Sequence, residues 1–431
     1  MPVQSVRLAD CGTADVGGVS SGNGMRVLML APRAPFPADH GAALRNFYLL
    51  RWLSRQHEVS LVAFGNPADT AAMRVLQEYA REVVILSPPR WTLPERMVTL
   101  FVSLEPDLAR RLWSPAFVEQ VRCRLERSSF DLVQIEGLEM YGLWEGARTG
   151  RHGVGPLVVL DAHNAEYSLQ ASAWRVSMRA GQWLPALYSF IQARRLRRYE
   201  QRACRAVHGV VVVSGEDEAA LRALYPPLRA CVVPNGVDTG RYASGPREVD
   251  GETLLFIGKM DYRPNIDAIS WFTAEIWPLI RGRRPRARLL IVGRDLRPEY
   301  QRLARLDGVE IIGAVPDERP WFDRASALIV PMRMGSGVRL KVLQAMAMGV
   351  PVISTPLGVA GIGGRDGEHY LLARTAVEFA DRTVRVLEEP ALGAALGASA
   401  RELVRSRFDW QVILPRLDDF YHELAGVSRV P

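Results

Sequence analysis

Short, unbroken apolar runs alternate with helical patterns along almost the whole of this chain. Strands that are buried on both faces read in this way, because helices cover the two sides of a parallel sheet. Such runs lie at 25–30, 58–64, 82–86, 131–135, 157–160 and 209–213 in the first half, and at 253–257, 288–292, 309–312, 327–330 and 350–354 in the second. The sequence therefore predicts an α/β protein with two doubly wound, Rossmann-like domains.

A change in composition marks the boundary between the two series of strands. The first series ends in a Pro-Asn-Gly turn at 234–236, and a polar stretch over 239–251 follows it. We place the first domain at 25–236 and the second at 237–406. An amphipathic run over 408–424 predicts a helix within the C-terminal segment 407–431. Residues 1–24 have no apolar core, so we expect a disordered extension and no signal peptide there.

The net charge indicates the class of ligand, and the cysteines indicate the cellular compartment. The formal net charge is +7 and the pI is about 9.4, which favours acidic ligands such as sugar phosphates, or an anionic membrane surface. Only two of the 54 basic residues are lysines, Lys259 and Lys341. Because all the other basic residues are arginines, a lysine at these two positions indicates a place that needs a compact point charge. Four scattered cysteines and the lack of a long apolar run predict a cytoplasmic protein with reduced thiols.

The stretch PMRMGSGVRLKVLQAMAMGVPVIST, at 331–355, combines a glycine turn, a helix and a buried strand. Gly335 and Gly337 bracket Ser336, so the backbone there can approach a ligand closely. The predicted helix, 338–348, begins directly after this turn and offers unpaired N–H groups and the positive end of its dipole. We therefore expect an anion, such as a phosphate, at the start of this helix.

Three side chains of the same helix extend the expected anion site. Arg339 and Lys341 add full positive charges beside the phosphate. Gln344 lies three residues after Lys341, on the same helical face. The ammonium could therefore meet a phosphate while the amide reaches a hydroxyl farther along the same ligand. The segment predicts a site for a phosphorylated ligand that also carries hydroxyl groups.

Several motifs, in this order, resemble the retaining glycosyltransferases of family 4 (glycosyl transferases group 1), which have the GT-B fold. They are VVPNGVD (232–238), LLFIGKMDYRPNIDAISWF (254–272), GAVPDERPWFDRASALIVPMRMGSGVRLKVLQAMAMGVPVISTPLGVAGI (313–362), DGEHYLLA (366–373) and FDW (408–410). The resemblance extends from residue 25 to the end of the chain. It implies two Rossmann-like domains that face each other across a cleft, with the segment 407–431 returning to the first domain.

The resemblance also implies a reaction. It predicts a retaining, metal-independent transferase that moves a sugar from a UDP- or GDP-linked donor to a saccharide, lipid-linked or small-molecule acceptor hydroxyl. We expect no cofactor and no metal, because cationic side chains would stabilise the leaving diphosphate. No side chain stands out as a covalent nucleophile. The acceptor hydroxyl would therefore attack the donor sugar from the same face that the nucleoside diphosphate leaves, with a β-phosphate oxygen as the base.

By the same resemblance, the donor-binding residues gather at the glycine turns and helix starts. They are Gly41, Gly258, Lys259, Gly335, Ser336, Gly337, Val338 and Gln344. Lys341 and Arg339 would neutralise the diphosphate and count as catalytic. The family usually has two glutamates eight positions apart, where this chain has Ser336 and Gln344. An amide can still bind ribose hydroxyls through neutral hydrogen bonds, so we expect donor affinity to be weaker by about 1–2 kcal/mol.

The acceptor side is expected around DAHNAE at 161–166, which follows a buried strand at its C-terminal end. The resemblance places His163 near the transferred sugar, as a third catalytic residue. Asn164 and Glu166 would lie beside it on the acceptor side. Arg45, one turn after Gly41, could contact a phosphate or the acceptor.

Other functions stay open from the sequence alone. A catalytically weak sugar-nucleotide-binding subunit that partners another transferase would explain Gln344. An epimerase on a related fold would need acidic groups that these motifs do not supply. Only the overall charge favours nucleic acid, so we expect no nucleic-acid partner. Basic stretches at 90–113 and 175–205 could lie on the inner, anionic face of a membrane, or could cover the sheet with a solvated arginine face.

Overall fold

A sheet of seven parallel strands forms the first domain. The computed structural model describes residues 24–426 except 39–40, 93–98, 100–102, 149–154, 180, 244, 246, 248, 250, 295–297 and 336. The strands, in the order β3-β2-β1-β4-β5-β6-β7, are β1 (Arg26–Ala31), β2 (Glu58–Phe64), β3 (Glu82–Leu86), β4 (Leu132–Glu136), β5 (Leu157–Ala162), β6 (Gly209–Val212) and β7 (Ala230–Val232). The order reverses between β1 and β4, so a crevice opens at their carboxyl ends.

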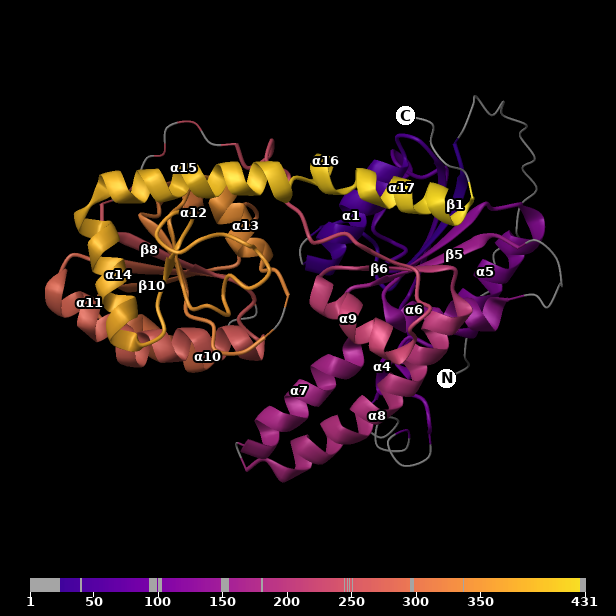
Figure 1. Ribbon diagram of the computed structural model, residues 1–431, viewed down its shortest axis with the longest axis horizontal. Helices are drawn as coiled ribbons and strands as arrows, with labels where there is room; N and C mark the ends of the chain where they lie inside the picture. Colours follow the sequence, from indigo (N-terminus) through magenta and orange to yellow (C-terminus); the bar gives the residue numbers. More distant parts are fainter. Residues whose placement is uncertain are drawn as a thin grey trace.

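The second domain repeats this arrangement with six parallel strands (Figure 1). In the order β10-β9-β8-β11-β12-β13, they are β8 (Thr253–Ile257), β9 (Arg288–Val292), β10 (Val309–Gly313), β11 (Ala327–Val330), β12 (Val352–Ser354) and β13 (Leu371–Leu372). Here the order reverses between β8 and β11. The prediction of two doubly wound α/β domains is confirmed, and the apolar runs form the strands because both faces of each sheet are covered.

Helices cover both faces of the two sheets. The first domain has α1 (Gly41–Leu53), α2 (Thr70–Gln77), α4 (Asp107–Arg110), α5 (Pro115–Arg127), α6 (Leu138–Ala147), α7 (Glu166–Arg179), α8 (Trp183–Ala206) and α9 (Gly215–Leu224). The second has α10 (Arg263–Trp271), α11 (Trp277–Arg283), α12 (Arg319–Arg324), α13 (Leu340–Ala347), α14 (Ala376–Glu388) and α15 (Pro390–Arg407). A π-helix, Phe272–Ile276, joins α10 to α11, and a 3-10 helix spans Pro298–Arg305.

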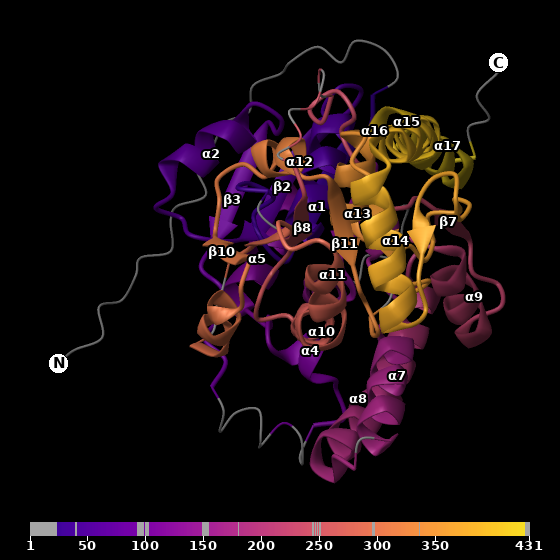
Figure 2. The same cartoon turned by 90° about the vertical axis from the view of Figure 1, so that its left-hand side faces the viewer.

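The stretch expected to be helical over 175–205 is a hairpin of two helices that projects from the first domain (Figures 1 and 2). Gly181 has a φ of +67°, a left-handed conformation that ends α7 and allows α8 to begin. The other basic stretch, 90–113, contains α4, but its residues 93–98 and 100–102 lie outside the described part of the chain, as do nearly all of residues 1–24. Among the described residues, no helix is both long and apolar enough to span a membrane.

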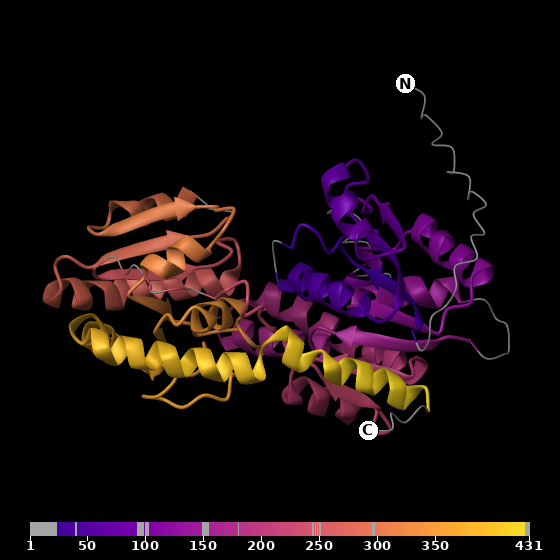
Figure 3. The same ribbon diagram turned by 90° about the horizontal axis from the view of Figure 1, so that it is seen from above.

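The last helices run from the second domain onto the first (Figure 3). After α15, the short α16 (Trp410–Ile413) and α17 (Pro415–Leu424) pack in one apolar cluster with Val27 and Met29 of β1. Tyr421 donates a hydrogen bond to Gln134 Oε1 of β4 at 2.8 Å. The segment that returns to the first domain also contacts the segment that leaves it. Asp409 of the returning segment accepts a hydrogen bond from the Thr239 backbone N–H at 3.1 Å. Two adjacent crossings therefore connect the domains.

The substitution Leu417→Ala tests how much α17 contributes to the first domain. Leu417 is fully buried against the sheet, so its truncation should leave a cavity and lower the free energy of unfolding by about 2–5 kcal/mol. Urea unfolding would measure the change in the first-domain transition. The control Val377→Ala changes a side chain that is 59% exposed on α14 and should have little effect. Equal stability of Leu417→Ala and the wild type would contradict the role given to α17.

Candidate functional site

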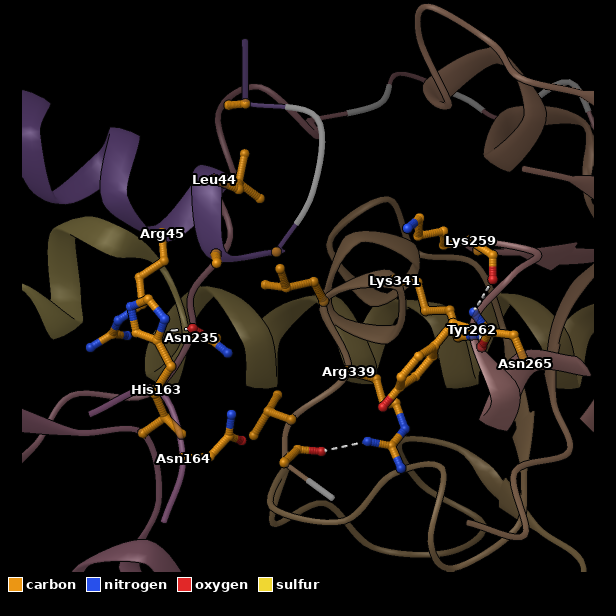
Figure 4. Close-up of a pocket in the computed structure, with 18 of the residues that line it drawn as sticks. Leu44, Arg45, His163, Asn164, Asn235, Lys259, Tyr262, Asn265, Arg339 and Lys341 are labelled. Carbon is orange, nitrogen blue, oxygen red and sulfur yellow. Dashed lines mark hydrogen bonds between the residues drawn. The ribbon is translucent and has the colours of Figure 1, made fainter. Parts of the chain in front are cut away.

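A cleft of about 1390 Å³ lies between the two domains. Its walls come from the carboxyl ends of β4 and β5 on one side and of β8 and β9 on the other, where ligands bind in open α/β sheets. The starts of α1 and α13 also line it. Figure 4 shows Arg45 and His163 from the first domain opposite Lys341, Arg339 and Lys259 from the second. Residues far apart in the sequence thus meet around one space.

Two helix N-termini face each other across this cleft. A Cβ atom on Gly41, at the start of α1, would lie 3.3 Å from Leu340 Cδ1, at the start of α13. Neither helix has an acidic residue in its first turn, so both positive dipole ends are available to an anion. Gly335 and Gly337 have φ values of +111° and +73°, which only glycine adopts readily. Ser336 between them lies outside the described residues.

Lys341 is the cation nearest to the centre of this arrangement. Its Nζ lies 3.2 Å from Asn265 Oδ1 and 4.6 Å from the centroid of the Phe256 ring. Burial, together with the charge of Arg339, lowers the pKa of Lys341 to about 7. Asn265 is itself oriented by a 2.9 Å hydrogen bond from its Nδ2 to the Lys259 carbonyl. The site therefore holds a lysine whose charge needs an anion to be stable.

The other donor-side residues surround this lysine. Arg339 is the N-cap residue of α13 and donates a hydrogen bond from NH1 to the Gly337 carbonyl at 3.0 Å, and burial lowers its pKa. Lys259 forms a 3.0 Å ion pair with Asp261 near the cleft mouth. A Cβ on Gly258 would lie only 2.7 Å from Asn265 Nδ2, so this turn leaves no room for a side chain. Val338 lines the same wall.

Gln344 contacts two residues that the sequence analysis did not identify. Its Nε2 donates hydrogen bonds to Tyr242 Oη at 2.7 Å and to Glu318 Oε1 at 3.1 Å. The Tyr242 hydroxyl also donates to Glu318, and burial together with this carboxylate raises the pKa of Tyr242. All three residues line the cleft. A carboxylate thus lies beside the amide that replaces the second glutamate of the family pattern.

Arg45 is engaged in contacts within the first domain. Only 1% of its surface is exposed, and its Nε and NH2 donate to the two carboxylate oxygens of Asp161 at 2.9 and 3.0 Å. Its NH1 donates to the Val233 carbonyl at 2.9 Å. The guanidinium therefore joins α1, β5 and the chain that leaves β7 toward the second domain. These contacts fit a positioning residue better than the acceptor contact predicted from the sequence.

His163 lies next to a buried carboxylate. Its Nε2 is 3.5 Å from Glu136 Oε2, and its side chain is 18% exposed where it lines the cleft. Burial and the neighbouring Asp161 raise the pKa of Glu136. Burial lowers the pKa of His163, but Glu136 and Asp161 outweigh it and the net shift is upward. His163 thus brings an imidazole with an upward-shifted pKa to the wall of the cleft.

Glu136, Asp161 and His163 are also the group within the described residues that could hold a metal ion. Their ligand atoms lie within 4.8 Å of one another. However, both Asp161 oxygens accept hydrogen bonds from Arg45, and Glu136 Oε1 accepts one from Gln134 Nε2 at 3.0 Å. The guanidinium supplies the positive charge that a metal would bring, so these residues fit an ion-paired network better than a metal site.

The residues expected on the acceptor side lie at the base of the hairpin α7–α8. Asn164 Nδ2 donates to Glu166 Oε1 at 3.4 Å, and burial, with the charge of Glu139, raises the pKa of Glu166 to about 7. Glu200 of α8 accepts hydrogen bonds from the Glu166 and Tyr167 backbone N–H groups at 2.7 and 2.9 Å, and so caps α7. The hairpin adds lining residues that the sequence did not mark, namely Gln170, Tyr188 and Gln192.

Two protein-family models match the chain and together cover most of it. The model described as Glycosyltransferase Family 4 matches residues 40–241, and the one described as Glycosyl transferases group 1 matches residues 251–389. The chain belongs to the glycosyltransferases of family 4. The cleft lies between the two matched regions, and the resemblance identified from the sequence motifs is confirmed.

Curated relatives are similar over much of this glycosyltransferase. A phosphatidyl-myo-inositol mannosyltransferase of Mycobacterium leprae is 25% identical over an alignment of 374 residues. The alignment covers 81% of this chain and 90% of the relative. A GDP-mannose:cellobiosyl-diphosphopolyprenol alpha-mannosyltransferase of Xanthomonas oryzae pv. oryzae is 26% identical over 236 residues, which are 51% of this chain and 60% of that protein.

Solved structures show the GT-B fold. Sucrose-phosphate synthase from Thermosynechococcus elongatus matches with a TM-score of 0.69 and 18% identity, over 94% of this chain and 100% of that one. Anabaena HepE in complex with UDP and glucose matches with a TM-score of 0.64 and 15% identity, over 92% and 98%. At these identities the similarity shows the fold alone.

Proposed function

We propose that this glycosyltransferase is retaining and metal-independent, and that it uses a UDP- or GDP-linked sugar. The observation that carries the proposal is the cation Lys341 at the start of α13, opposite the start of α1. A diphosphate placed there would meet two helix N-termini and restore the charge of the lysine. Arg339 and Lys259 add charge around the same place, so the leaving group needs no metal for neutralisation.

The proposed reaction exchanges one bond at the anomeric carbon for another. The bond from C1 of the sugar to the β-phosphate oxygen breaks, and the acceptor oxygen bonds to C1 from the same face. The acceptor proton passes to the departing diphosphate. His163, across the cleft from Lys341, would hydrogen-bond to the transferred sugar, because its imidazole lines this cleft. Asn164 and Glu166 would bind the acceptor hydroxyls.

A saccharide or lipid-linked hydroxyl is the proposed acceptor. The names of two relatives refer to phosphatidyl-myo-inositol and to cellobiosyl-diphosphopolyprenol, both of them lipids with a polar head. The acceptor side of this chain offers hydroxyl-binding groups, Asn164, Glu166, Gln170 and Gln192, along a cleft wall. Such groups suit a polyhydroxylated head better than a purely apolar acceptor.

We further propose that Glu318 binds the ribose of the donor. Its Oε1 lies 3.1 Å from Gln344 Nε2, so carboxylate and amide face the same part of the cleft. A carboxylate accepts charge-assisted hydrogen bonds from ribose hydroxyls, and an amide can complete the pair by donating. Glu318 would then replace the charge that the chain lacks at position 344. This arrangement favours an active enzyme over the weak binding subunit that Gln344 alone suggested.

A panel of donors tests the proposed reaction. UDP-, GDP-, ADP- and TDP-sugars are incubated with the protein in EDTA, and release of free nucleoside diphosphate is measured. One donor should be cleaved at the same rate with and without the chelator. Because Lys341 stabilises the leaving group, Lys341→Met should lower turnover by about 100-fold or more, whereas the exposed control Arg374→Gln should not.

The stereochemistry of the product completes this test. NMR of the transferred sugar should show the same anomeric configuration as the donor. Inversion, or a requirement for a divalent metal, would overturn the proposed mechanism. A donor that raises Tm yet is never cleaved, even with crude acceptor extracts, would instead support the binding subunit.

The ribose contact is tested with Glu318→Gln. The variant should bind the nucleoside diphosphate about five- to thirtyfold more weakly, the usual difference between charged and neutral hydrogen bonds. It should bind the 2′,3′-dideoxy analogue as the wild type does, because that ligand has no hydroxyls to lose. Titration calorimetry measures both affinities, with the exposed Glu310→Gln as the control. Equal weakening for both ligands would mean that Glu318 acts only by holding the site together.

A further inference from the structure

The free end of the hairpin α7–α8 exposes a cluster of apolar side chains. At the start of α8, Trp183, Leu184 and Leu187 are 70%, 82% and 57% exposed. Val176 and Met178, near the end of α7, are 40% and 38% exposed. Five of the thirteen large apolar side chains that are exposed among the described residues thus lie on this one projection. Figures 1 and 2 show that it points away from both domains.

Between Glu166 and Glu200, the charged side chains of the same hairpin are all basic. Residues 167–199 contain six arginines and no aspartate or glutamate. With 47 acidic residues in 431, a stretch of this length would ordinarily hold three or four. Arg194, Arg197 and Arg198 are exposed on α8, on the side of the tip toward the body of the domain. An apolar end followed along α8 by exposed arginines matches the depth profile of an anionic bilayer, which is apolar below its phosphates.

Hydrogen bonds and ring packing hold the hairpin in a fixed position. Tyr188 donates a hydrogen bond to Asp107 Oδ2 at 2.7 Å, and Gln192 Oε1 accepts one from the Asp107 backbone N–H at 3.0 Å. Trp174 of α7 packs on Phe190 of α8 with ring centroids 5.4 Å apart. The two helices are therefore fixed to each other, and Tyr188 and Gln192 fix α8 to α4.

The inner side of the hairpin lines the acceptor side of the cleft. Gln170, Tyr188 and Gln192 belong to that wall, and Trp183 and Leu184 lie one to two helical turns farther toward the tip. A surface that held the tip would therefore stand close to the mouth of the acceptor side. The exposed apolar tip, the arginines within residues 167–199 and the fixed position of the hairpin thus all favour the same kind of partner.

We propose that the hairpin α7–α8 docks this protein on an anionic lipid bilayer. Trp183, Leu184 and Leu187 enter the interface, and Arg194, Arg197 and Arg198 bind the lipid phosphates. The bilayer then presents lipid-borne acceptors to the cleft wall formed by Gln170 and Gln192. The docking itself does not depend on which donor the enzyme uses. A second copy of the chain, which would cover the same apolar tip, is the competing occupant.

Vesicle sedimentation tests the docking. The full chain is mixed with vesicles of phosphatidylcholine alone, or of phosphatidylcholine with phosphatidylglycerol. Binding should occur on the mixed vesicles and weaken as salt is added. The variant W183S/L184S/L187S should lose binding by about tenfold or more, because the apolar insertion is gone. The variant R194Q/R197Q/R198Q should lose about a hundredfold on the mixed vesicles, from the usual contribution of each basic residue near an anionic surface.

A matched control removes the same number of exposed apolar side chains elsewhere. The variant L279S/V377S/V412S changes residues that are 39%, 59% and 41% exposed, and it should bind vesicles as the wild type does. All variants should keep the wild-type Tm and the same donor cleavage in solution, since none of the substituted residues lines the cleft. Retained Tm with lost sedimentation thus separates a docking surface from a folding defect.

Two results would overturn the proposal. In the first, the wild type fails to bind anionic vesicles, or the tip variant binds as well as the wild type. In the second, ultracentrifugation shows that the wild type is a dimer and that W183S/L184S/L187S is not, while the wild type binds no vesicles. The second result would assign the apolar tip to a contact between copies of the chain.

Discussion

The desolvated ammonium of Lys341 is the constraint on which the candidate site depends. Burial next to Phe256 and the charge of Arg339 destabilise its protonated form, so that its pKa is lowered to about 7. The surroundings offer a neutral partner, Asn265, and the positive ends of α1 and α13. Burial, the charge of Arg339 and the helix dipoles disfavour the ammonium, and Arg339 and the dipoles favour an anion. A diphosphate would satisfy all of them at once.

The rest of the fold places the two halves of the site against each other. Arg45 ties α1 to Asp161 of β5 and to the chain leaving the first domain, so one buried ion pair orients the helix start, the neighbourhood of His163 and the crossing to the second domain. The returning segment packs α17 onto the first sheet. Removing either partner of the ion pair would leave a buried charge uncompensated, which typically costs about 3–5 kcal/mol.

Local patterns were sufficient to predict most of the strands and the start of α13. Continuous apolar runs located every strand except the short β7 and β13 to within a few residues, and the glycine turn before 338–348 located the start of α13. The helical segment 263–283 is not one continuous α-helix, because a π-helical turn joins α10 to α11. That turn ends just before Pro278, which has no N–H to continue the α-helical hydrogen bonds.

Contacts between distant residues could not be predicted in this way. Gln344 meets Tyr242 and Glu318, which are 102 and 26 positions away, and no local pattern marks either residue as a partner. The contacts of Arg45 could not be predicted for the same reason, because its partners Asp161 and Val233 lie on other strands or beyond them. The hairpin wall of the cleft likewise arises only when α7 and α8 fold back on each other.

Calorimetric titration with a nucleoside diphosphate in two buffers of different ionisation enthalpy tests the central claim most directly. At pH 8 the free Lys341 is mostly neutral, and a bound diphosphate would raise its pKa. Binding should therefore take up close to one proton, and affinity should fall as the pH rises above about 7. Lys341→Met should bind more weakly without proton uptake. Binding without proton uptake by the wild type, or the same uptake by Lys341→Met, would contradict the account.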